Sequence, residues 1–133
     1  MSKAIKVLVA EDDQDIRELI LITLKFHGFA TTSVINGASA VEKAQEDDFD
    51  LIILDVRMPG MDGYEACRIL RQMERTRKTP VIMLSAKGQE SEIKAGFEAG
   101  ANKYILKPFA PDELVQIIHE VTNSATNGRQ TTS

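Results

Sequence analysis

The stretch Leu51-Ile52-Ile53-Leu54-Asp55 carries four consecutive aliphatic residues that run directly into a carboxylate. A short continuous apolar run of this kind predicts a strand buried on both faces, as in a parallel sheet. Pro59, Gly60 and Gly63 follow closely, and breaking residues at this density prevent a strand or helix from continuing. Asp55 is therefore expected at the carboxyl end of the strand, the edge at which open α/β sheets bind ligands. A lone aspartate there is also typical of a turn-capping carboxylate, so its role depends on its neighbours.

Similar strand patterns recur and alternate with segments of helical period. The expected strands are 5–10, 29–34, 50–54, 81–84 and 103–106, and a helix is expected after each of them. Five repeats of strand and helix predict an α/β fold, a parallel sheet with helices on both faces. Residues 29–34 are half polar, which favours a place near the sheet edge. We expect one domain over residues 1–122 and a flexible C-terminal tail over 123–133, because the tail has nothing to bury.

Composition narrows the class of protein. A length of 133 residues and a hydrophobic share of 43% fit one globular domain. The net charge of -4 gives no electrostatic reason to expect binding to nucleic acid or membrane. The single cysteine, Cys67, excludes an internal disulfide and suits a reducing compartment. No apolar run approaches the roughly 18 residues of a membrane span, and we recognise no signal peptide, so we expect a cytoplasmic protein.

Polar side chains follow the most apolar strands. They are Glu11 and Asp12 after the first strand, Asp55 after the third, Ser85 after the fourth and Lys107 after the fifth. Parallel strands bring these ends to one edge of the sheet, so the side chains are expected to share one pocket. Two carboxylates about 4 Å apart repel each other by about 4 kcal/mol at an effective dielectric constant of about 20. An oxygen-rich cluster without thiols or histidines therefore predicts a hard divalent cation, Mg²⁺.

The remaining members of the set favour phosphoryl transfer. Lys107 supplies a compact positive charge and Ser85 a hydroxyl donor. A cation, an ammonium and a hydroxyl around one carboxylate provide the positioning and charge neutralisation that phosphoryl transfer requires. Asp55 is the expected nucleophile, and its product would be an acyl phosphate.

Four motifs carry a family resemblance. They are Val7-Leu8-Val9-Ala10-Glu11-Asp12, Leu54-Asp55-Val56-Arg57-Met58-Pro59-Gly60-Met61-Asp62-Gly63, Leu84-Ser85-Ala86 and Tyr104-Ile105-Leu106-Lys107-Pro108-Phe109. Over residues 5 to 122 the chain resembles the receiver domain of two-component response regulators. The resemblance implies a flavodoxin-like (βα)5 three-layer sandwich with a five-stranded parallel sheet in the order 2-1-3-4-5.

The resemblance also implies a role for each matching residue. Asp55 would be the phosphorylation site and would take the phosphoryl group from a phosphohistidine. Mg²⁺ would be bound by Asp12 directly, by Glu11 through water, by Asp55, and by the backbone carbonyl of Arg57. Ser85 and Lys107 would hold the phosphoryl oxygens and catalyse the transfer.

A switch is implied as well. Tyr104 would turn inward once Ser85 moves toward the phosphoryl group, although a half-buried strand tyrosine without that role is the alternative. The helix after residue 88, the strand after Asn102 and the last helix would form the output face. Lys107-Pro108 is a candidate cis bond. Two departures are evident, since the family more often has Asp at Glu11 and Thr at Ser85.

The expected function is that of a phosphoacceptor signalling protein rather than an enzyme. Its partners would be a sensor histidine kinase or phosphotransfer protein and a downstream protein target, and it would be a monomer or a phosphorylation-dependent dimer. No output domain is expected after residue 122, so signalling would proceed by docking or by phosphorelay. A receiver segment of a larger regulator or hybrid kinase is the alternative.

Two further classes fit less well. A Mg²⁺-dependent phosphatase of the haloacid dehalogenase type needs a second Asp where Arg57 stands. A flavin or nucleotide carrier needs a phosphate-binding loop where Glu11, Asp12 and Asp13 would repel phosphate. The basic run Arg68 to Lys78 is interpreted as a solvated helix end rather than a docking patch.

Overall fold

A computed structural model describes the backbone of residues 4–131 and the side chains of residues 4–123. The strands are β1 (Lys6–Ala10), β2 (Ala30–Val34), β3 (Leu51–Asp55), β4 (Val81–Ser85) and β5 (Lys103–Leu106). The helices are α1 (Gln14–Phe26), α2 (Gly37–Glu46), α3 (Gly63–Gln72), α4 (Glu90–Ala99) and α5 (Pro111–Thr131). Within the described part of the chain, no helix is long and apolar enough to cross a membrane.

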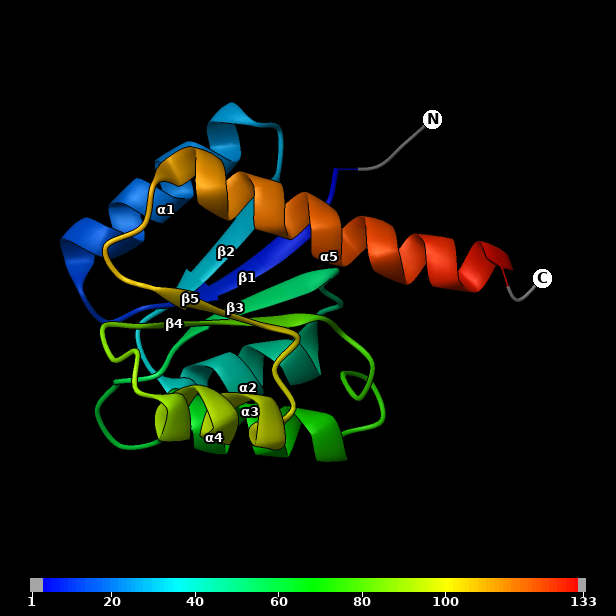
Figure 1. The fold of residues 1–133 in the computed structure, drawn as a ribbon. Coiled ribbons are helices and arrows are strands. Elements are labelled where there is room, and N and C mark those ends of the chain that lie inside the picture. The colour runs from blue at the N-terminus through cyan, green and yellow to red at the C-terminus, as the bar shows by residue number, and fades with distance from the viewer. Residues whose placement is uncertain (1–3, 132–133) are drawn as a thin grey trace.

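The strands form one parallel sheet in the order β2-β1-β3-β4-β5, which confirms the predicted flavodoxin-like topology. Helices α1 and α5 cover one face, and α2, α3 and α4 cover the other (Figure 1). The half-polar strand β2 lies at the edge of the sheet, as predicted.

Burial on both faces explains the apolar runs of the central strands. Every residue of β3 and β4 is buried. Successive side chains point to opposite faces of a strand, so Ile52 packs with the α2–α3 side while Leu51 and Ile53 pack with the α1–α5 side. The sheet is therefore held from both sides, which gives the residues at its carboxyl edge a rigid base.

Helix starts follow the caps that the sequence offers. Asp13 accepts a hydrogen bond from the backbone N–H of Ile16 at 3.0 Å, and Asn36 accepts one from Ser39 at 2.7 Å. Both residues are N-caps, a position that Asp and Asn favour. The peptide bond Lys107-Pro108 is cis, which confirms that prediction.

The last helix continues further than its apolar pattern. The periodic residues end at Val121, yet the backbone of α5 is helical as far as Thr131. The predicted domain limit at residue 122 therefore does not coincide with the end of this helix. The expected flexibility of 123–133 stays a prediction, because the side chains beyond 123 lie outside the described residues.

Arg71 at the end of α3 is a structural cap rather than a solvated side chain. Its Nε donates to the carbonyl of Gly100 at 3.0 Å and its Nη1 to the carbonyls of Thr76 at 3.1 Å and Thr79 at 2.6 Å. Its Nη2 donates to Asn102 Oδ1 at 2.9 Å. The interpretation of the basic run as solvated is therefore wrong at this position, because Arg71 joins the loop before β4 to the loop before β5.

Replacing Arg71 by methionine is expected to lower the free energy of unfolding by about 2 kcal/mol, because several carbonyls lose a charged donor. Arg68→Met is the matched control, since Arg68 is exposed on the same helix and should change stability by less than about 0.5 kcal/mol. Urea denaturation measures both values. Equal effects of the two substitutions would contradict the capping role.

Candidate phosphoryl-acceptor site

The predicted pocket exists at the carboxyl edge of the sheet. Asp55 is the last residue of β3 and Ser85 the last of β4, while Glu11 directly follows β1 and Lys107 directly follows β5. Six of the predicted residues line one open pocket: Glu11, Asp12, Asp55, Arg57, Ser85 and Lys107. Parallel pairing is the cause, because it aligns Ala10 with Leu54 and Asp55 with Leu84 across neighbouring strands.

The turn after β3 holds Asp55 tightly against the start of α3. The backbone N–H of Gly63 donates to the carbonyl of Val56 at 2.9 Å. A Cβ at Gly63 would clash with the backbone carbonyl of Asp55, so only glycine allows this close approach. Asp62 then caps α3 by accepting from the N–H of Glu65 at 2.9 Å. Gly63 and the capping residue Asp62 therefore hold the end of β3, which carries Asp55, against the start of α3.

Lys107 is the cation that contacts the carboxylates. Its Nζ lies 2.9 Å from Asp55 Oδ1 and 3.0 Å from Glu11 Oε1, and only 15% of its side chain is exposed. Burial alone would lower the pKa of Lys107, but the hydrogen bonds and charges of Asp55 and Glu11 outweigh burial and raise it. The ammonium is therefore held in its charged form beside Asp55.

Glu11 is the member of the cluster whose carboxyl group is most affected by burial. It is fully buried, and burial raises its pKa to about 7; the charge of Asp55 adds to the rise, whereas Lys107 opposes it. Glu11 Oε2 accepts from the N–H of Asp13 at 3.2 Å. Glu11 Oε1 is buried, and among the described side chains its partner is the Lys107 ammonium at 3.0 Å, with no further hydrogen-bond donor. Such an oxygen is a ready ligand for a cation.

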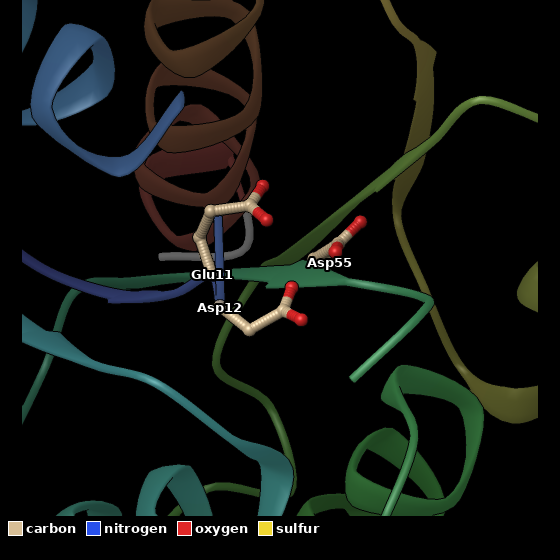
Figure 2. A group of neighbouring side chains, drawn as sticks. All are labelled: Glu11, Asp12 and Asp55. Carbon is tan, nitrogen blue, oxygen red and sulfur yellow. The ribbon is translucent and has the colours of Figure 1, made fainter. Parts of the chain in front are cut away.

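The acidic cluster fits a magnesium ion. Glu11, Asp12 and Asp55 each offer a carboxylate oxygen, and these three atoms lie within 4.8 Å of one another. Figure 2 shows the three carboxylates projecting into a common space from the ends of β1 and β3. The Lys107 ammonium contacts two of these three carboxylates, those of Glu11 and Asp55, and oxygen-only ligands suit a hard divalent cation. The oxygen-only donor set and the buried oxygen of Glu11, which has only the Lys107 ammonium beside it, therefore both agree with Mg²⁺.

The two predicted switch residues, Ser85 and Tyr104, differ in their position relative to the pocket. Ser85 Oγ lies at the pocket and accepts a hydrogen bond from the N–H of Lys87 at 3.0 Å. Tyr104 lies outside the pocket lining, and its hydroxyl donates to the carbonyl of Lys87 at 3.2 Å. Lys87 therefore stands between the two predicted switch residues.

The structure adds residues that the sequence did not single out for the site. Asp13, Ile16 and Ala86 also line the pocket. Tyr64 lies beyond it, where its hydroxyl meets that of Tyr104 at 3.3 Å. One signal for Tyr64 was available, since it is the other of the two tyrosines and directly follows Gly63.

The fold and pocket together define a receiver domain. The Vibrio cholerae chemotaxis protein CheY4 superimposes with a TM-score of 0.86 at 33% identity, covering 90% of this chain and 99% of that one. The receiver domain of a sensor histidine kinase from Pseudomonas aeruginosa superimposes with a TM-score of 0.86 at 32% identity, covering 91% of this chain and 99% of that one. That structure has a magnesium ion coordinated in its active-site cleft.

The chain belongs to the response regulator receiver domain family, whose model matches residues 7–119. The transcriptional regulatory protein ResD of Bacillus subtilis is 46% identical over 110 residues, which cover 83% of this chain and 45% of ResD. The phosphate regulon regulator PhoB of Rhizobium meliloti is 41% identical over 110 residues, covering 83% of this chain and 48% of PhoB. The chain thus spans about half the length of the curated relatives it matches. Receiver domains of this family are phosphorylated on an aspartate in two-component signalling.

Proposed function

We propose that Asp55 is the phosphoryl acceptor. A carboxylate oxygen of Asp55 attacks the phosphorus of a phosphohistidine on a sensor histidine kinase or phosphotransfer protein. The P–N bond breaks, and its electron pair stays on the histidine ring. The contact between Lys107 Nζ and Asp55 Oδ1 at 2.9 Å carries this proposal, because it places a buried positive charge where the phosphoryl oxygens would arrive.

The other pocket residues have supporting roles. Glu11, Asp12, Asp55 and the backbone carbonyl of Arg57 would hold Mg²⁺, and the ion when bound would neutralise the phosphoryl oxygens. Ser85 Oγ accepts a hydrogen bond from the N–H of Lys87, so the hydroxyl proton of Ser85 is available to donate to a phosphoryl oxygen. Lys107 would pair with a second oxygen.

The new charge would then act on the output face. Phosphorylation adds about 1.5 to 2 negative charges and three strong acceptors, which would draw Ser85 and Lys107 toward Asp55. The proposed response is a repacking of α4, β5 and α5, with Tyr104 as the switch aromatic. Phe97 on α4 and Leu106 on β5 are large apolar side chains, 47% and 45% exposed, which suits a protein-binding surface there.

The wider context follows from the same proposal. The protein acts as a phosphoacceptor in the cytoplasm, as a monomer or a phosphorylation-dependent dimer, and passes its signal by docking or by phosphorelay. The net charge of -4 gives this domain itself no reason to bind nucleic acid. A second candidate is a receiver segment of a larger transcriptional regulator, which the half-length match to ResD and PhoB favours.

Intact-mass measurement after incubation with Mg²⁺ and a small phosphodonor such as acetyl phosphate tests the acceptor. The native chain is expected to gain one phosphoryl group and Asp55→Ala none. Asp48→Ala is the control, because it removes an exposed aspartate that lies away from the pocket and is expected to keep the gain. A gain that survives Asp55→Ala would point to another acceptor, and steady phosphate release from organic esters would favour the phosphatase class.

A further inference from the structure

The two tyrosines of the chain meet at their hydroxyl groups. Tyr64 lies on α3 and Tyr104 on β5, and their Oη atoms are 3.3 Å apart. Tyr64 Oη also lies within hydrogen-bond distance of the carbonyl of Glu92 on α4, at 3.0 Å, and Tyr104 Oη within that of the carbonyl of Lys87, at 3.2 Å. The pair therefore joins α3, α4, β5 and the loop after β4, and α3 and α4 cover the same face of the sheet (Figure 1).

The ring of Tyr104 sits in a space that only glycine leaves open. A Cβ at Gly96 of α4 would lie 2.7 Å from Tyr104 Cδ2 and 2.9 Å from Tyr104 Cε2. Gly96 is buried within the helix, where glycine is less favourable than alanine. The aromatic ring thus fills the space that a side chain at position 96 would take. We call this arrangement the seated position of Tyr104.

The two tyrosine hydroxyls have fewer protons than close contacts. Each phenol has one proton, so the pair has two protons for three close contacts: Tyr64 with Glu92, Tyr104 with Lys87, and the two hydroxyls with each other. Burial first, and then the hydrogen bond and charge of Tyr104, raise the pKa of Tyr64, so its phenol stays protonated and able to donate. Removing the Tyr64 hydroxyl would leave Tyr104 with the Lys87 carbonyl alone.

Both ends of the pair reach segments that carry pocket residues. Tyr64 follows Gly63, which packs directly on the backbone of Asp55. Lys87, the acceptor for Tyr104, donates its own N–H to Ser85 Oγ at 3.0 Å. The tyrosine pair is therefore linked to the acceptor residue on one side and to the hydroxyl donor on the other.

We propose that Tyr64 is a positioning residue for Tyr104: its hydroxyl holds Tyr104 in the seated position and favours that position before any phosphoryl group is present. This inference rests on the proposed function for its consequence, since the seated position matters to signalling only if Tyr104 is the switch. Tyr64 shifts the equilibrium of Tyr104 toward the seated position in the unphosphorylated protein, and it takes no part in the chemistry at Asp55.

The test uses protein without phosphodonor, with carbon-13-labelled tyrosine rings observed by NMR. The chain has two tyrosines and no tryptophan, so Tyr64→Phe leaves Tyr104 as the single labelled residue. Gly96→Ala supplies the unseated reference, because its methyl group fills the seat while alanine favours the helix. Tyr104→Phe assigns the remaining signal of Tyr64 in the native spectrum.

In Tyr64→Phe, the Tyr104 signal is expected to move toward its position in Gly96→Ala, with the ratio of unseated to seated forms rising about twofold to tenfold, the usual worth of one neutral hydrogen bond. An unchanged Tyr104 signal in Tyr64→Phe would overturn the proposal. A Gly96→Ala spectrum with Tyr104 in its native position would overturn it too, because the seat would then not exist.

Phosphorylation is read separately. Tyr64→Phe is expected to gain one phosphoryl group by intact mass as the native chain does, because its role is not chemical. If the native chain gains none, the proposed function fails while the tyrosine measurement still stands. If Tyr64→Phe alone loses the phosphoryl gain, Tyr64 acts on the acceptor site and the positioning role is wrong.

Discussion

Lys107→Met is expected to lower the free energy of unfolding of the metal-free domain by about 3 kcal/mol and to slow phosphoryl acceptance about a hundredfold. The Lys107 ammonium lies 2.9 Å from Asp55 and 3.0 Å from Glu11, and both carboxyl groups are buried. Without the ammonium, the two buried carboxylates repel each other with no positive charge in contact. Glu11 limits the cost, because its raised pKa lets it take up a proton instead.

Urea denaturation in the presence of a chelator measures the stability, and intact mass after phosphodonor treatment measures the acceptance. Lys103→Met is the matched control, because Lys103 begins the strand β5 that Lys107 directly follows. Lys103 pairs with Glu120 at 3.9 Å, and 46% of its side chain is exposed, so its loss should cost less than about 1 kcal/mol. If the two substitutions cost the same, Lys107 does not compensate the carboxylates.

Added Mg²⁺ separates charge compensation from packing in the Lys107→Met variant. A divalent cation would neutralise the same carboxylates, so it is expected to recover most of the lost stability. It is not expected to restore the rate of acceptance, because the ammonium that meets the phosphoryl oxygens would still be missing. Recovery of neither property would assign the defect to lost packing of the lysine stem.

The sequence predicted the sheet and its edge because both depend on local signals. Four aliphatic residues before Asp55 mark a strand buried on both faces, and β3 spans Leu51–Asp55, one residue later at each end than the predicted 50–54. A parallel sheet then places strand ends together whatever the intervening helices contain. The contacts of Lys107 with Asp55 and Glu11 follow from that geometry alone, so residues far apart in sequence were predicted to meet.

Contacts between helices and loops were not predictable in the same way. Arg71 belongs to a basic run whose exposed members are solvated, and no local pattern distinguishes it from Arg68. Its carbonyl partners come from two loops that approach only after the sheet has formed. Tyr64 is a similar case, because its partner Tyr104 is brought to it by the packing of α3 and α4 beside β5.

The end of the last helix shows a different limit. Apolar periodicity identifies the part of a helix that packs on the domain, and in α5 the last buried residue among the described side chains is Val121. Backbone hydrogen bonds within a helix need no such pattern, so α5 continues to Thr131. Hydrophobic patterning therefore does not predict where the backbone of this helix ends.

Asp12→Ala is expected to remove the Mg²⁺-dependent part of the domain's stability. A cation that binds only the folded state stabilises it by about 2.7 kcal/mol at a hundredfold excess over its dissociation constant. Asp12 is the exposed member of the carboxylate cluster, so its loss removes a ligand without opening the core. Without metal, the variant is expected to be at least as stable as the native domain, because one repulsive charge has gone.

Thermal unfolding midpoints over a Mg²⁺ titration measure both effects. Asp15→Ala is the matched control, because it removes the same charge from the first turn of α1 but lies outside the cluster. This control is expected to keep the metal-dependent rise in midpoint, whereas Asp12→Ala is expected to show a flat response. A rise of native size in Asp12→Ala would mean that Mg²⁺ stabilises the fold elsewhere. In that case, the repulsion between the buried carboxylates of Glu11 and Asp55 would have to be balanced by Lys107 alone.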